Sequence, residues 1–119
     1  MLPKKNRANK KIIAKIFKEG KSVFSDNLNL KYLKNDFADR KISFIAPKIV
    51  SKKAVGRNLL KRRGYAVLEK YFKKLPSGFS GVFIFGKKSL EIFGGRKNKK
   101  YNSIQNLENE IKITLNKLY

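Results

Sequence analysis

Apolar residues recur every three or four positions in three stretches of the chain, which is the spacing of an amphipathic helix. The stretches are residues 10–19, residues 54–75 and residues 103–118. Asn9 is a candidate N-cap for the first stretch, and Gly20 is a candidate stop for it. The apolar stripes are, in chain order, Ile13, Ile16 and Phe17; Leu60, Gly64, Val67, Leu68, Tyr71 and Leu75; and Ile104, Leu107, Ile111, Leu115 and Leu118.

Between the helices the pattern changes to that of strands. Alternating apolar and polar residues predict one strand over residues 22–34 and another over roughly 41–46, which Pro47 should end. A nearly continuous apolar run over residues 79–85 predicts a buried strand. A helix between two strands suggests a crossover unit, so the class is α+β, while strand order and hand stay open. The alternating apolar residues are Leu28, Leu30 and Tyr32, then Ile42, Phe44 and Ala46.

The charge of the chain points to a polyanionic partner. A length of 119 residues fits one domain, and 41% hydrophobic residues suffice for a modest core. Lys and Arg number 30 against 8 Asp and Glu, a net charge of +22. Self-repulsion at such a charge costs stability, and binding nucleic acid relieves it. An anionic membrane is the weaker alternative, because no long amphipathic helix ends in exposed aromatics.

The composition excludes several kinds of site. Cysteine and histidine are absent, which rules out disulfides, Cys/His zinc sites and histidine-based catalysis. The apolar run after the basic N-terminus is too short for a signal peptide or a membrane span, so we expect a cytoplasmic protein. The spacing of the acidic residues does not suggest the converging carboxylates of a two-metal nuclease. They include Asp26, Asp36, Asp39, Glu108 and Glu110.

Two basic segments lie outside the predicted helices and strands. Residues 1–9 are expected to form an extended arm, since Pro3 disfavours a helix before it. Residues 94–100 are expected to form a mobile loop whose charge can be solvated without a specific partner. We predict a single domain over residues 1–119 that carries both segments.

The densest chemistry lies at the start of the middle helix. Five residues at positions i, i+1, i+4, i+5 and i+8 form one stripe beside the apolar one. Arginine can clamp a phosphate with two hydrogen bonds, and the nearby helix N-terminus favours the same anion. A solvated helix face rich in Lys and Arg is the competing interpretation. The stripe consists of Arg57, Asn58, Lys61, Arg62 and Tyr65.

This stripe belongs to a run that resembles the signature of the bacterial ribonuclease P protein component. Ala54, Val55, Arg57, Asn58, Lys61 and Arg62 match that signature position by position. The lead-in over residues 47–52 and the opening segments 2–7 and 17–22 are similar to the same family. The similarity extends to about Phe85. Leu59, Ile13 and Tyr65 depart from the residues that are frequent in the family at these positions.

The resemblance implies a single-domain α/β sandwich with a mostly antiparallel sheet of about four strands, three helices and a left-handed βαβ crossover, similar to a domain of ribosomal proteins. It implies an accessory subunit of an endoribonuclease, in which the RNA subunit hydrolyses precursor tRNA with magnesium and the protein holds no tightly bound cofactor. A monomer in a one-to-one ribonucleoprotein is expected, with two sets of binding residues. Expected to contact the RNA subunit are Lys52, Lys53, Arg57, Asn58, Lys61 and Arg62, and expected to line the 5′ leader cleft are Ile13, Phe17, Tyr32, Lys48 and Tyr65.

Three alternatives remain open at this stage. A plain RNA-binding module, such as a small ribosomal protein, also explains the charge and the basic helix. A DNA-binding protein with residues 54–72 as its recognition helix is weaker, because a strand and a basic turn precede that helix. Phe17 and Tyr32 could also be core residues, as aromatics on amphipathic elements usually are.

Overall fold

The computed structural model describes residues 7–34, 40–75, 78–89, 93 and 103–117. Its elements are, in chain order, α1 (Lys10–Glu19), β1 (Lys21–Phe24), β2 (Leu28–Lys34), β3 (Lys41–Ile45), α2 (Ala54–Glu69), the 3-10 helix η2 (Phe72–Lys74), β4 (Phe79–Phe85) and α4 (Ser103–Asn116). The predicted arm over residues 1–9 is described only from Arg7 onward, and the predicted loop over residues 94–100 lies outside the described residues.

The first helix begins and ends where the sequence predicts. The Asn9 side chain accepts a hydrogen bond from the backbone N–H of Ile12 at 2.9 Å, which caps the helix. Gly20 ends it with an extended backbone, at φ −75°. A Cβ on Gly20 would lie 2.5 Å from the Ile16 carbonyl oxygen and 2.8 Å from that of Tyr32. Glycine is therefore required here by the close approach of two backbone segments.

The single strand predicted over residues 22–34 is wrong, because the chain makes a hairpin there. β1 and β2 pair antiparallel, with Val23 opposite Leu30. The turn between them is closed by a hydrogen bond from the Ser25 N–H to the Leu28 carbonyl at 2.9 Å. Ser, Asp and Asn at positions 25–27 are frequent turn residues, so the sequence did contain the signal.

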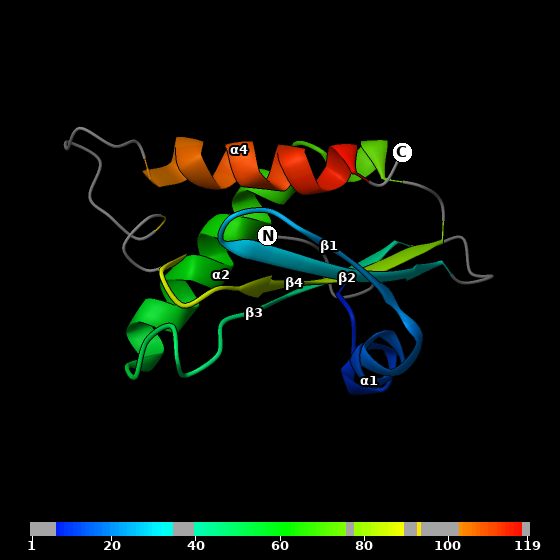
Figure 1. Ribbon diagram of the computed structural model, residues 1–119, viewed down its shortest axis with the longest axis horizontal. Coiled ribbons are helices and arrows are strands. Elements are labelled where there is room, and N and C mark those ends of the chain that lie inside the picture. The colour runs from blue at the N-terminus through cyan, green and yellow to red at the C-terminus, as the bar shows by residue number, and fades with distance from the viewer. Residues whose placement is uncertain (1–6, 35–39, 76–77, 90–92, 94–102, 118–119) are drawn as a thin grey trace.

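The four strands form one mixed sheet in the order β1-β2-β4-β3. β2 pairs antiparallel with β4, and β3 pairs parallel with β4. Because α2 links the two parallel strands, the predicted crossover is confirmed, and so is the α+β class with a mostly antiparallel sheet. Figure 1 shows α2 and α4 together on one side of the sheet and α1 on the other.

The middle helix is shorter than predicted. α2 ends at Glu69, and the chain continues through a turn into η2 instead of a regular helix to Leu75. The apolar stripe still faces the core, and Leu60 and Leu68 are fully buried. Gly64 lets the helix approach the sheet, since a Cβ there would lie 2.6 Å from the Phe44 ring.

The main core lies between the sheet and the α2–α4 pair. Phe44 stacks on Phe83, with ring centres 4.8 Å apart, and on Phe85 at 5.8 Å. Tyr71 on the α2 side donates a hydrogen bond to Glu108 of α4 at 2.6 Å. α4 is also tied to the first hairpin by the buried carboxylate of Glu110. That carboxylate accepts from Ser25 Oγ at 2.6 Å and from the backbone and side chain of Asn27 at 2.7 and 2.9 Å.

Candidate nucleic-acid interface

The basic stripe of α2 borders a pocket at the outer edge of the sheet. The pocket has a volume of about 370 Å³ and lies between α2, strand β3 and the described start of the chain. Three cationic side chains line it, from Arg7, Lys61 and Arg62. The remaining lining residues are Ser43, Phe44, Asn58 and Tyr65. The structure thus brings four of the five predicted stripe residues to one concave site, and it adds Arg7.

Tyr65 has a structural role at the back of this pocket. Its hydroxyl accepts a hydrogen bond from the Phe44 N–H at 3.3 Å, and its ring meets the Phe44 ring edge-on at 4.9 Å. It is only 8% exposed. β3 is an edge strand, so this hydroxyl satisfies a backbone donor that no neighbouring strand pairs. Tyr65 is therefore fixed as a wall of the pocket.

Arg7 comes to the pocket because the chain before α1 follows the same edge strand. The Ala8 N–H donates to the Ile42 carbonyl at 3.1 Å, and Arg7 forms an isolated parallel bridge with Ile42. The Arg7 guanidinium lies 5.9 Å from the centre of the Tyr65 ring, a distance typical of a cation–π contact. No pattern in the sequence indicates this pairing, because a single bridge leaves no periodic signal.

Arg57 has a different position from its neighbours in the stripe. One of its guanidinium nitrogens donates to the carbonyls of Ser51 and Lys52 at 2.9 and 3.0 Å. These bonds hold the loop that leads into α2, whose N-cap residue Lys53 makes no side-chain cap. Lys52 and Lys53 are both exposed in this loop. Arg57 thus fixes the approach to the helix, while the cations that α2 supplies to the pocket, Lys61 and Arg62, come from its next turn.

The two cations that the basic stripe of α2 places at the pocket, Lys61 and Arg62, are available to a partner. Asn58 and Arg62 are exposed, and Lys61 is half-buried. Within the described part of the chain, no carboxylate forms an ion pair with Lys61 or Arg62. The solvated-face interpretation is weakened by the pocket, because a plain solvated face is not concave.

The five residues predicted to line a leader cleft do not share one surface. Phe17 of α1 is 44% exposed and lies on the α1 face of the sheet. Tyr32 lies on the opposite face, where its ring stacks on Phe79 at 5.8 Å and packs against the core. Tyr65 belongs to the pocket at the β3 edge. Because the sheet separates Phe17 from Tyr32, one cleft cannot contain both side chains.

The other two residues predicted to line the leader cleft, Ile13 and Lys48, do not lie on the face that carries Tyr32 either. Ile13 is half-buried on α1, and Lys48 is exposed in the turn that follows β3. The residue that does accompany Phe17 is Lys31, whose ammonium nitrogen lies 5.0 Å from the centre of its ring. Lys31 was missed, although the alternation that turns Tyr32 toward the core also turns its neighbour toward α1.

The acidic residues that the structure describes do not converge. Glu110 and Glu108 are each held by hydrogen bonds from other side chains of the fold. In the described ranges, no group of three His, Cys, Asp or Glu side chains could hold a metal ion. Among the described helices, none is long and apolar enough to cross a membrane.

A sequence model of the family Ribonuclease P matches residues 2–118. This chain belongs to the ribonuclease P protein family. Among curated protein sequences, none matches it. The family match covers the helix, the hairpin and the crossover described above, and so includes every residue of the pocket at the β3 edge.

Solved structures of ribonuclease P proteins share the fold. The Thermotoga maritima protein is 24% identical, with a TM-score of 0.79 over 95% of this chain and 97% of that one. The Staphylococcus aureus protein is 16% identical, with a TM-score of 0.75 over 98% of this chain and 96% of that one. The α+β architecture is therefore that of bacterial ribonuclease P proteins.

Proposed function

We propose that this chain is the protein subunit of ribonuclease P, which binds the catalytic RNA subunit and the 5′ leader of precursor tRNA. It assists removal of the leader during tRNA maturation in the cytoplasm. The RNA subunit performs the hydrolysis with its own bound magnesium, and the protein supplies binding energy and orientation. We propose a monomer in a one-to-one ribonucleoprotein.

The exposed cations of α2 carry this proposal for the RNA subunit. Lys61, Arg62 and Arg7 surround a concave site, and Asn58 adds an amide that can donate and accept hydrogen bonds. Each phosphate that such cations neutralise releases counterions, which favours binding. Arg57 supports the site by fixing the loop that displays Lys52 and Lys53. Together with the family match, this arrangement supports a contact to a folded RNA backbone.

The α1 face of the sheet supports the contact to the leader. A single strand is bound by aromatic rings that stack on its bases and by cations that follow its backbone. Phe17, 44% exposed, and Lys31, 5.0 Å from its ring, offer both on one surface. Ile13 is half-buried on the same helix. Tyr32 and Tyr65 are left out of this surface by their packing.

Reconstitution tests the proposal. The protein is mixed with a bacterial ribonuclease P RNA and precursor tRNA at low magnesium, and cleavage is compared with the RNA alone. We expect faster cleavage with the protein, because its cations replace part of the counterion atmosphere between two RNAs. No acceleration would overturn the proposal. If the protein still bound RNA with nanomolar affinity, a plain RNA-binding module would take its place.

A paired substitution tests the site. Lys61→Gln together with Arg62→Gln should weaken binding to the RNA subunit and reduce the slope of log affinity against log salt by about one to two. Lys87→Gln with Lys88→Gln removes the same charge from an exposed turn and is the matched control. Equal losses of affinity in the two variant pairs would show that only net charge matters and that the basic stripe of α2 is not the site.

A further inference from the structure

A second basic pocket lies on the other side of the sheet from α1, between the end of α2 and the last helix. It has a volume of about 200 Å³ and is lined by Tyr71, Lys74, Leu75, Lys112, Leu115 and Asn116. The first three residues come from the segment around η2, and the others come from α4. Figure 1 shows these two elements side by side above the sheet. The pocket shares no residue with the one at the β3 edge.

The polar groups of this pocket suit an anion. The ammonium nitrogens of Lys74 and Lys112 lie 5.6 and 5.8 Å from the centre of the Tyr71 ring. Both distances are typical of cation–π contacts, which hold the two charges near each other despite their repulsion. Asn116 adds an amide donor, and none of the described residues that line the cavity carries a carboxylate. Leu75 and Leu115 supply apolar walls.

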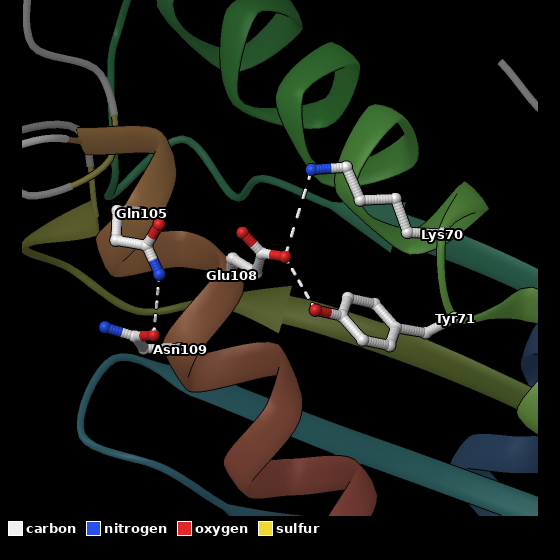
Figure 2. Close-up of polar contacts among 5 residues, drawn as sticks. All are labelled: Lys70, Tyr71, Gln105, Glu108 and Asn109. Atoms are coloured by element: carbon white, nitrogen blue, oxygen red, sulfur yellow. Dashed lines mark hydrogen bonds and ion pairs between the residues drawn. The ribbon is translucent and has the colours of Figure 1, made fainter.

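A described carboxylate close to this pocket, that of Glu108, is held by hydrogen bonding and an ion pair. Figure 2 shows Glu108 reaching from α4 to the Tyr71 hydroxyl, which donates to it at 2.6 Å, and to the Lys70 ammonium at 3.9 Å. The hydrogen bond from Tyr71, followed by the charges of Lys70 and Lys112, lowers the pKa of Glu108. Glu108 therefore stays ionised. Its ion pair is with Lys70, which is not among the described residues that line the cavity.

We propose that this pocket binds one backbone phosphate of an RNA strand, at a site separate from the basic stripe of α2 and from the α1 face of the sheet. Two ammonium groups and an amide match the charge and the acceptors of a phosphate. The volume is below the roughly 300–1,000 Å³ of pockets that enclose drug-sized ligands, so it admits a phosphate with part of its ribose. The apolar walls contact that ribose.

The choice of RNA rests on the proposed function, whereas the phosphate chemistry rests on the pocket alone. A chain of net charge +22 gains from contacts to a polyanion on more than one side. Because the pocket and Phe17 lie on opposite sides of the sheet, the strand bound here is a different segment from one bound beside α1.

A titration of the full chain with a uridine decamer, followed by NMR, tests the site. We expect the Tyr71 ring and the Lys112 and Leu115 amides to shift on addition of the decamer. Lys74→Gln with Lys112→Gln should abolish these shifts, weaken decamer binding by about threefold or more, and lower the salt slope by about 0.7. The pair Lys87→Gln and Lys88→Gln again matches the change in charge and should keep the shifts.

The other outcomes have defined meanings. Absent shifts at Tyr71 and Lys112, or equal losses in both variant pairs, overturn the site. Uridine monophosphate or inorganic phosphate that binds the pocket as tightly as the decamer would assign it to a free anion and overturn the RNA partner. None of these readouts requires ribonuclease P RNA. Failure of reconstitution with an intact decamer response would therefore contradict the proposed function and leave this site standing.

Discussion

The face of the sheet beneath α2 and α4 is closed by side chains that are at most 2% exposed, whereas the face beside α1 is only partly covered. On this closed face the buried side chains are Leu28, Leu30, Ile42, Phe44, Phe79, Phe83 and Phe85. On the other face, Val82 is buried under α1, and Ile16 is the buried residue among the described positions of that helix. Leu33, Ile45 and Ile84 are half-buried there, and Phe17 and Phe24 are 44% and 58% exposed.

This contrast separates two tasks that both use apolar residues. Two helices close the first face, so its side chains contribute to stability through burial. One short helix covers part of the second face, and the exposed ring of Phe17, beside Lys31, remains accessible to a partner. A contiguous exposed apolar patch with polar residues at its rim commonly marks a binding surface. Substitutions on the two faces should therefore differ in which property they change.

The sharpest test of the contrast uses two leucines of the same strand. Leu30 is fully buried on the closed face, and Leu33 is half-buried on the α1 face. Leu30→Ala should lower the free energy of unfolding by about 2–5 kcal/mol, because it removes a buried side chain and leaves a cavity. Leu33→Ala should cost clearly less. Urea unfolding measures both, and equal costs would show that the two faces are packed alike.

A smaller effect is expected where the closed side is tied to the first hairpin. Glu110→Gln keeps the size of the side chain but turns one acceptor into a donor facing the Asn27 amide. We expect a loss of about 1–3 kcal/mol in the free energy of unfolding. Ser25→Ala removes one of the three hydrogen bonds and should cost less. If Glu110→Gln left the free energy of unfolding unchanged, packing alone would hold α4 on the hairpin.

The elements of the closed side were predictable because their signals are local in the sequence. The stripe with Leu60, Val67 and Leu68 predicted a helix and its buried face, and the nearly continuous apolar run over 79–85 predicted a buried strand. The hairpin turn was missed because the alternation of Leu28, Leu30 and Tyr32 was extended backward through polar residues. The end of α2 at Glu69 was missed because Tyr71 and Leu75, which flank the 3-10 helix η2, still pack against the same core.

The candidate site was only partly predictable, since it depends on contacts far apart in the chain. The spacing of Asn58, Lys61 and Arg62 gave their common face. The bridge that brings Arg7 beside them leaves no pattern in the sequence. The resemblance named Tyr32 for the leader cleft, but the pairing of β2 with β4 turns its side chain to the core. Strand parity decides between Lys31 and Tyr32, and parity needs the register of the sheet.

The two faces should also differ in leader binding. Phe17→Ala should weaken binding of precursor tRNA by about 1–2 kcal/mol, the loss of one stacked base, with little change in stability. Mature tRNA lacks the leader and should bind as before. Tyr32→Ala should lower stability and affect both RNAs equally, because its ring packs on Phe79. If Tyr32→Ala selectively weakened the binding of precursor tRNA, the assignment of the leader to the α1 face of the sheet would be wrong.

The smallest expected effect is a pH dependence at the rim of the closed side. The hydrogen bond from Tyr71 lowers the pKa of Glu108 from its ordinary value of 4.5, so the ionised carboxylate stabilises the fold at neutral pH. This stabilisation is present above pH 4.5 and is lost as the pH falls through the lower pKa of the folded state.

Urea midpoints of the native chain and of Glu108→Gln, compared over a series of pH values, measure this effect. The native chain should be the more stable of the two at neutral pH, and the difference should shrink as acid protonates Glu108. Leu30→Ala is the control, since a buried leucine has no proton to exchange and its cost should stay nearly constant. A difference for Glu108→Gln that is equally constant would mean that the hydrogen bond with Tyr71 does not depend on the charge.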